Sequence, residues 1–178
     1  MAISTIAGVG AGSSGTILTT GAPQSGGVIQ TVSTTLTGTF TMTGQTQTAI
    51  TGLSATITPK FSTSSILVIV TIGGYSQGTG QGRFILTRGG TNIGIGAAGS
   101  GQLQSSFVIS GPSSGAPMVT GGISYLDSPA TTSSTAYGVT VSSNDSGAAI
   151  YINRSVTDSG STSYQRTISN ITVMEIAA

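Results

Sequence analysis

The alternation of apolar and hydroxyl residues predicts that this chain is built from β-strands. Between Val28 and Thr43 most of the apolar side chains, Val32, Leu36 and Phe40 among them, share one parity, and threonine or serine fills most of the other. A period of two residues places the two sets on opposite faces of a strand. Threonine, branched at its β-carbon, favours the extended backbone and keeps the outer face polar without charge.

The same pattern predicts further strands along the rest of the chain. They fall near residues 46–51, 53–58, 65–75, 82–88, 104–110, 118–126, 136–142, 148–153 and 164–176. The run Ile66-Leu-Val-Ile-Val is apolar on both parities. It therefore predicts a central strand covered on both faces, by a second sheet or by a neighbouring subunit.

Turn signals between the strands complete an all-β prediction. Arg88-Gly-Gly-Thr91 fits a two-residue hairpin, because both central positions need positive φ, and Asn144-Asp-Ser-Gly147 fits a longer turn. No segment carries the 3.6-residue apolar period of a helix. Short strands at regular spacing predict an antiparallel β-sandwich, jelly-roll-like in its connections.

The first 27 residues differ from the rest in composition. Residues 1–27 are mostly glycine, serine, alanine and threonine without a period, which predicts an extended N-terminal arm or linker. The folded domain is then 28–178. The beginning of the chain lacks the basic flank and apolar stretch of a secretion signal, so we do not expect export as a free secreted protein.

Charge is scarce and scattered. Charged residues make up 5% of the chain and the net charge is +1. The five cations are spread along the sequence: Lys60, Arg83, Arg88, Arg154 and Arg166. Such a distribution argues against nucleic-acid binding, and the longest apolar run, 66–70, is far shorter than the roughly 20 residues of a membrane helix, so we expect no membrane insertion.

The residue inventory leaves little for catalysis. The chain has no cysteine and no histidine, which excludes disulfides, thiol nucleophiles, imidazole bases and most transition-metal sites, and Lys60 alone gives a serine nucleophile scant support. A glycosidase would need two of the four acids, Asp127, Asp145, Asp158 and Glu175, across a cleft. We favour plainer roles, with Asp127-Ser-Pro starting a turn and Asp145 and Asp158 lying in loops.

Other motifs have equally plain interpretations. Gly10-Ala-Gly-Ser-Ser-Gly15 and Gly94-Ile-Gly-Ala-Ala-Gly99 match a dinucleotide fingerprint but lack its strand–helix context, and no segment resembles a calcium loop. Asn144, Asn153 and Asn170 begin glycosylation-like triplets that are common in so hydroxyl-rich a chain. The rings of five tyrosines could either contact sugars at a binding face or pack in the core or an interface: Tyr75, Tyr125, Tyr137, Tyr151 and Tyr164. We favour packing, and we predict no catalytic, cofactor-binding or metal-binding residue.

Several segments carry a resemblance to a known family. They are GLSATITP at 52–59, SSILV at 64–68, FILTRGGTNI at 84–93, SYLDSPAT at 124–131, YINRS at 151–155 and ITVMEI at 171–176. On these segments the chain resembles virion structural proteins of marine and cyanobacterial tailed bacteriophages, often called tail fibre proteins. The resemblance implies a β-sandwich subunit, homotrimeric and displayed on the virion after assembly in the bacterial cytoplasm. It offers no active site to carry over.

Two functions follow from this resemblance. The first is a tail fibre or tail-appendage subunit for host attachment, with loops 111–117 and 144–147 contacting a surface glycan or protein and residues 1–27 anchored to other virion proteins. The second is a capsid decoration or cement protein, whose arm lies across neighbouring head subunits. A depolymerase is the weakest alternative, because no carboxylate pair stands out.

Overall fold

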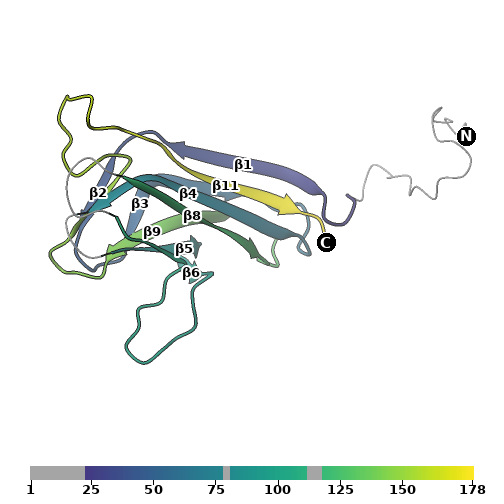
Figure 1. The fold of residues 1–178 in the computed structure, drawn as a ribbon. Helices are drawn as coiled ribbons and strands as arrows, with labels where there is room; N and C mark the ends of the chain where they lie inside the picture. The colour runs from purple at the N-terminus through teal and green to yellow at the C-terminus, as the bar shows by residue number, and fades with distance from the viewer. Residues whose placement is uncertain (1–22, 78–80, 112–117) are drawn as a thin grey trace, which may run out of the picture.

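The chain folds into two antiparallel β-sheets that pack face to face. A computed structural model describes residues 23–77, 81–111 and 118–178, and these contain eleven strands and no helix (Figure 1). The predicted all-β, antiparallel sandwich is therefore confirmed. Within the described ranges no helix is long and apolar enough to cross a membrane.

Each sheet combines strands from distant parts of the sequence. In the first sheet the order is β1 (Val28–Leu36), β11 (Ser169–Ile176), β4 (Ser65–Gln77) and β8 (Val119–Asp127), with β10 (Ala149–Ile152) and β2 (Phe40–Thr43) continuing from the far end of β4. In the second the order is β3 (Thr48–Ile57), β9 (Thr135–Ser143), β5 (Gly82–Arg88) and β6 (Thr91–Ile93), and β7 (Phe107–Ile109) also pairs with β5.

The long strands alternate between the two sheets along the chain. β3, β5 and β9 belong to the second sheet, and β4, β8 and β11 belong to the first. This alternation supports the predicted jelly-roll connectivity, which stays a prediction.

The core lies between the sheets and follows the period-two pattern. Inward side chains of β4, Ile66, Val68 and Val70, meet Phe84 and Tyr137 from the second sheet in one buried apolar cluster. Each such side chain stabilises the fold by roughly 1.5–3 kcal/mol through removal from water. The outward Leu67 and Ile69 of β4 are only half-buried, and Thr71 is exposed. The single chain therefore covers one of the two faces of this strand that the sequence predicts to be covered.

Several strand boundaries differ from those predicted. The strands near 46–51 and 53–58 form one strand, β3, whose register shifts between Ala49 and Ser54 around Gly52. The hairpin at Gly89 and Gly90 is confirmed, with φ of +55° and +84°, and its return arm is β6. The prediction near 104–110 is wrong before Phe107, and the prediction near 164–176 is wrong over 164–168, where the chain runs in turns and one isolated bridge.

Both described ends of the chain leave the same end of the sandwich. The Gly26 amide donates to the Ala177 carbonyl at 2.9 Å, and the Ala177 amide donates to the Gly27 carbonyl at 2.9 Å. The turn at 144–147 and the long connection 153–168 lie at the opposite end (Figure 1). Of the predicted arm, residues 1–22 lie outside the described residues, and Gly26 and Gly27 are joined to the C-terminal segment.

Asn153 connects its own segment with two others at that opposite end. Its fully buried side-chain amide donates to the carbonyls of Leu36 and Gly38, both at 2.9 Å, and its Oδ1 accepts from Ser169 Oγ at 2.7 Å. Its backbone adopts φ of +61°, a conformation that asparagine tolerates better than most residues. A buried and bonded amide also cannot serve as the glycosylation acceptor that its triplet suggested.

We therefore expect Asn153→Ala to lower the free energy of unfolding by about 3 kcal/mol, because two carbonyls lose their donor, the buried Ser169 hydroxyl loses its acceptor, and alanine is strained at positive φ. The matched control is Asn92→Ala, which removes only an exposed hydrogen-bonded pair with Gln47. Urea denaturation at one protein concentration measures both variants. Equal losses would contradict the role assigned to Asn153.

Candidate binding groove

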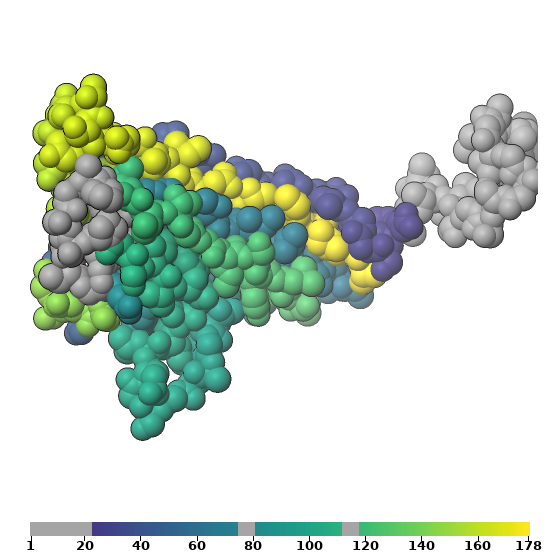
Figure 2. Space-filling view, viewed as in Figure 1, coloured from purple at the N-terminus to yellow at the C-terminus, as the bar shows by residue number. Residues whose placement is uncertain are grey.

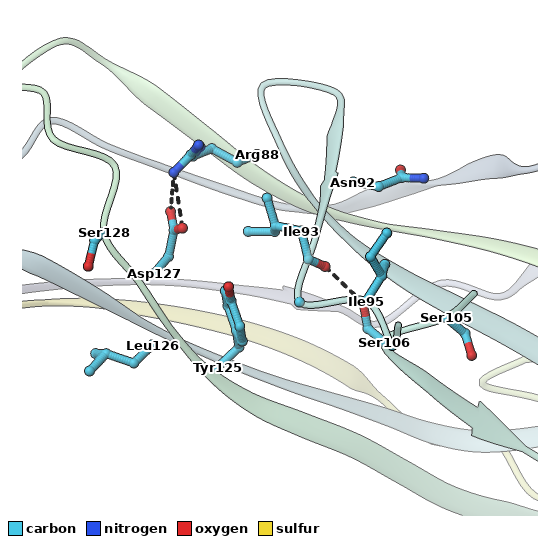
Figure 3. Close-up of a pocket in the computed structure, with 12 residues that line it drawn as sticks. Arg88, Asn92, Ile93, Ile95, Ser105, Ser106, Tyr125, Leu126, Asp127 and Ser128 are labelled. Carbon is cyan, nitrogen blue, oxygen red and sulfur yellow. Dashed lines mark hydrogen bonds and ion pairs between the residues drawn. The ribbon is translucent and has the colours of Figure 1, made fainter. Parts of the chain in front are cut away.

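An open groove of about 890 Å³ lies where β8 separates from the β5–β6 hairpin. Its walls come from both sheets and from the loop that follows β6 (Figure 3). The lining residues are Arg88, Asn92, Ile93, Gly94, Ile95, Gly96, Ser105, Ser106, Tyr125, Leu126, Asp127 and Ser128.

The Asp127 carboxylate joins the two sheets at one end of this groove. Asp127 is the last residue of β8 in the first sheet, and Arg88 and Tyr137 are cross-strand neighbours in the second. Arg88 Nη1 donates to both carboxylate oxygens, at 3.0 and 2.9 Å, and the Tyr137 hydroxyl donates to Oδ2 at 2.6 Å. The Asp127 side chain is 7% exposed and that of Arg88 34% exposed, so the pair lies at the boundary between core and groove.

Tyr137 acts only as a hydrogen-bond donor in this arrangement. Burial raises the pKa of its hydroxyl, and the hydrogen bond and charge of Asp127 raise that pKa further. The phenol therefore remains protonated over the whole working range of pH.

Tyr125 and Gly94 set the shape of the groove beside this pair. Tyr125 is half-buried on β8, and its ring lies against Gly94, whose φ is +58°. A methyl group on Gly94 would lie 3.0 Å from Tyr125 Cδ2, so glycine permits this close approach. In Figure 3 the Tyr125 and Ile93 side chains point into the space between the strands, whereas Leu126 points away.

The loop 94–106 projects from the body of the sandwich next to the groove (Figure 2). Its base is fixed by Ser106, whose Oγ accepts from the Leu86 amide at 2.8 Å and donates to the Ile93 carbonyl at 3.1 Å. Farther out, Ile95 is 36% exposed and Leu103 is 56% exposed. The segment 94–99, which matched a dinucleotide fingerprint, is thus part of a surface loop and begins no helix.

The chemistry of the groove suits a ligand rich in hydroxyl groups. The Arg88 guanidinium and the hydroxyls of Tyr125, Ser105 and Ser128 offer hydrogen bonds, and the Tyr125 ring with Ile93 offers apolar contact. Because Asp127 neutralises Arg88, the groove has no net charge to attract an anion. A neutral sugar combines hydroxyls with apolar C–H faces in this way.

Glu175 is also buried, on β11 of the first sheet. Its Oε1 accepts from the backbone amides of Lys60 and Phe61, at 2.7 and 3.1 Å, and its Oε2 accepts from Gln30 Nε2 at 2.6 Å. Burial acts to raise the pKa of this carboxyl, but the hydrogen bonds from Gln30 and the two amides together lower it below its usual value. Glu175 therefore holds the 58–64 turn against β1 and β11.

The remaining acids are engaged in loops. Asp158 binds Arg166 Nη2 at 2.7 Å, which with the charge of Arg154 lowers the pKa of Asp158. Asp145 Oδ1 accepts from the Gly147 amide at 2.9 Å, which confirms its predicted place in a turn. The turn-starting role predicted for Asp127 is wrong, because its carboxylate faces Arg88 and Tyr137 across the sandwich.

The structure brings together few of the residues that the sequence singled out. Asp127 among the acids and Tyr125 among the tyrosines line the groove. Tyr137 is in the core, as packing predicted, and Tyr151 lies under the Arg154 guanidinium at 4.5 Å. Of the loops predicted to contact a host, 112–117 lies outside the described residues. In the described ranges no three acids cluster as a metal site would require.

Comparison of the chain with models of known protein families and with curated proteins finds no match. The resemblance to tailed-phage virion proteins therefore remains an expectation drawn from the segments given above.

We expect Asp127→Asn to lower the free energy of unfolding by about 2–4 kcal/mol, because it removes the charge that pairs with Arg88 at a largely buried position. The matched control, Asp158→Asn, weakens only solvent-accessible ion pairs and is expected to have little effect. Chemical denaturation in high and low salt compares the two. A loss for Asp158→Asn as large as that for Asp127→Asn would refute the bridging role.

The lowered pKa of the Glu175 carboxyl predicts that the folded protein loses stability in acid. Since its pKa is lower in the folded chain than in the unfolded one, its contribution is complete above the unfolded value of 4.5 and is lost as pH falls from there through the lower folded value. Glu175→Gln should be less stable near pH 7 by about 1–3 kcal/mol and should show a shallower decline over that range. Unfolding free energies at several pH values test this, and parallel pH curves for the two proteins would contradict it.

Proposed function

We propose that this chain is a non-enzymatic structural subunit of a tailed-phage virion, a tail fibre or tail-appendage protein that takes part in host attachment. The observation that carries the proposal is the open, neutral groove beside a projecting loop, on a body whose acids are all engaged in structural hydrogen bonds or ion pairs. Such a surface is suited to holding a ligand rather than transforming one.

The placement of the chain ends at one end of the sandwich also supports a role in attachment. Gly26 and Gly27 leave the sandwich beside the C-terminal segment, so residues 1–27 can anchor one end of the domain to other virion proteins. The turn at 144–147 and the connection 153–168 then face outward from the opposite end (Figure 1). The expected partners are copies of the same chain as a homotrimer, neighbouring virion proteins, and a bacterial surface glycan.

Glycan is the favoured receptor because of the groove. Its donors are uncharged hydroxyls and one neutralised guanidinium, and its floor is partly aromatic. A surface protein as receptor would instead be contacted across several loops and would not depend on this groove.

A capsid decoration protein is the second candidate. The same anchored end and compact body would suit a head subunit whose role is mechanical. In that case the groove would have no ligand, which separates the two functions.

If the groove binds a glycan, removal of the Tyr125 hydroxyl should weaken that binding. Tyr125→Phe keeps the ring against Gly94 but removes the hydroxyl. We expect it to bind the host's purified surface polysaccharide about tenfold more weakly, because the loss of one hydrogen bond costs about 1.4 kcal/mol of binding free energy. Tyr151→Phe, outside the groove, is the matched control. Surface plasmon resonance with the intact chain measures both, and either absent binding by the wild type or equal binding by Tyr125→Phe would refute the groove as the receptor site.

A further inference from the structure

The outer face of the first sheet carries a continuous apolar surface. The strand register places Leu126, Leu67 and Met174 in one row across β8, β4 and β11. Ile69 lies in the next row, and Ile176 is the next outward residue of β11. We call these five residues the apolar face. In Figure 2 β11 appears as a yellow band between the purple β1 and the teal β4, which locates this face on the molecule.

These side chains are solvent-accessible in the single chain. Leu126 is 56% exposed, and the other four are half-buried, as outward residues in the interior of a sheet are. Val28, which pairs with Ile176 at the edge of the sheet, is 58% exposed and extends the same surface. A contiguous apolar patch of this kind marks an interaction surface more often than isolated exposed residues do.

No charged residue lies among the outward positions of these four strands. Besides the apolar face, the outward positions hold Thr31, Ser33, Thr35, Ser65, Thr71, Thr120, Gly122, Ser124, Asn170 and Thr172. Burial of the face would therefore leave no charge without a partner, which is the largest cost of forming an interface.

Four polar side chains on β1 and β11 of this face are hydrogen-bonded to one another. Asn170 Nδ2 donates to Ser33 Oγ and Thr35 Oγ1, both at 3.0 Å, and Thr172 Oγ1 lies 2.8 Å from Asn170 Oδ1 and 2.9 Å from Ser33 Oγ. Since their bonds are made within the sheet, these four groups lose little when water is removed. The polar cluster on β1 and β11 is therefore compatible with burial.

The β3–β9 part of the outer face of the second sheet shows what a solvated surface of this chain looks like. Outward positions of β3 and β9 hold Ser54, Thr56, Ala136, Gly138 and Thr140, which are small or carry hydroxyls. Large apolar residues are not absent from this sheet's outer side, because the register also turns Ile85 of β5 and Val108 of β7 outward. The hydroxyl pattern therefore belongs to the β3–β9 part of the face, and solubility of a monomer would favour the same pattern on the first sheet.

We propose that copies of this chain associate with one another through the outer face of the first sheet. Four strands about 4.8 Å apart, each contributing some seven or eight residues at about 3.3 Å, present a surface of roughly 500 Å² in projection. Two such surfaces together bury roughly 1,000 Å², which is the lower bound for a specific interface. A face without charge meets its own copy without repulsion, whereas a different protein partner is usually selected by complementary charge.

This association also covers the second face of β4, whose run Ile66-Leu-Val-Ile-Val is apolar on both parities. The inference rests on the self-association included in the proposed function and assigns it a surface. It is tested without reference to any receptor, so that its failure and the failure of the attachment role are distinguishable.

Native mass spectrometry and sedimentation of the full chain provide the test. We expect a closed oligomer for the wild type and at least a 100-fold weaker association for Met174→Glu and Leu67→Glu, because each would bury an unpaired charge. Thr56→Glu, on the outer face of the second sheet, is the matched control and should assemble as the wild type does. A monomeric wild type, or an oligomer that both face variants leave intact, would overturn the proposal.

A second measurement avoids dependence on variants that fold poorly. The chain has no cysteine, so Ser124→Cys and Thr56→Cys each introduce one outward thiol on otherwise native protein. We expect a maleimide to label Ser124→Cys at least tenfold more slowly in the oligomer than after dilution to monomer, and to label Thr56→Cys equally in both. Rapid labelling of Ser124→Cys in the oligomer would show that another surface forms the contact, whereas attachment at the groove would be unaffected.

Discussion

The contact of Asp127 with Arg88 and Tyr137 ties the sandwich together at the edge where it is open. One carboxylate from the first sheet receives three hydrogen bonds from two neighbouring residues of the second. Without it, β8 would be held to the second sheet only by apolar packing beside a groove that water can enter. The same contact neutralises Arg88 and gives the groove its uncharged character, so stability and binding chemistry depend on one interaction.

Scarcity of charge explains much of the remaining architecture. Two of the four acids, Asp127 and Glu175, lie in the interior, where each receives several hydrogen bonds. Threonine and serine, rather than charged residues, make most of the surface hydrophilic. A surface of hydroxyl groups is soluble, but it neither repels nor attracts another protein over a distance. Two such surfaces can therefore differ in their interactions through their apolar content alone. The hydroxyl-rich β3–β9 surface of the second sheet suits solvent, and the apolar face of the first sheet suits the association of copies proposed above.

The strand pattern was predictable because the period of two is a local property. Val28–Leu36, Gly82–Arg88 and the hairpin at Gly89 could be assigned from neighbours along the sequence. The groove could not, since Arg88 and Asp127 are 39 residues apart and meet only when the two sheets pack. Of its residues, the sequence singled out Tyr125 as a possible sugar contact and Asp127 as a turn residue. The apolar face was foreshadowed by the run 66–70, but its extension to Met174 and Leu126 required the register of β4 with β11 and β8.

Cryo-electron microscopy of intact virions that contain this chain tests the central claim, attachment, most directly. The predicted result is a small number of copies on the tail, assembled into an oligomer with the first sheets facing inward and the groove and loop 94–106 exposed to the outside. Many copies distributed over the head lattice, with the groove covered by capsid subunits, would contradict the attachment role and favour decoration of the head.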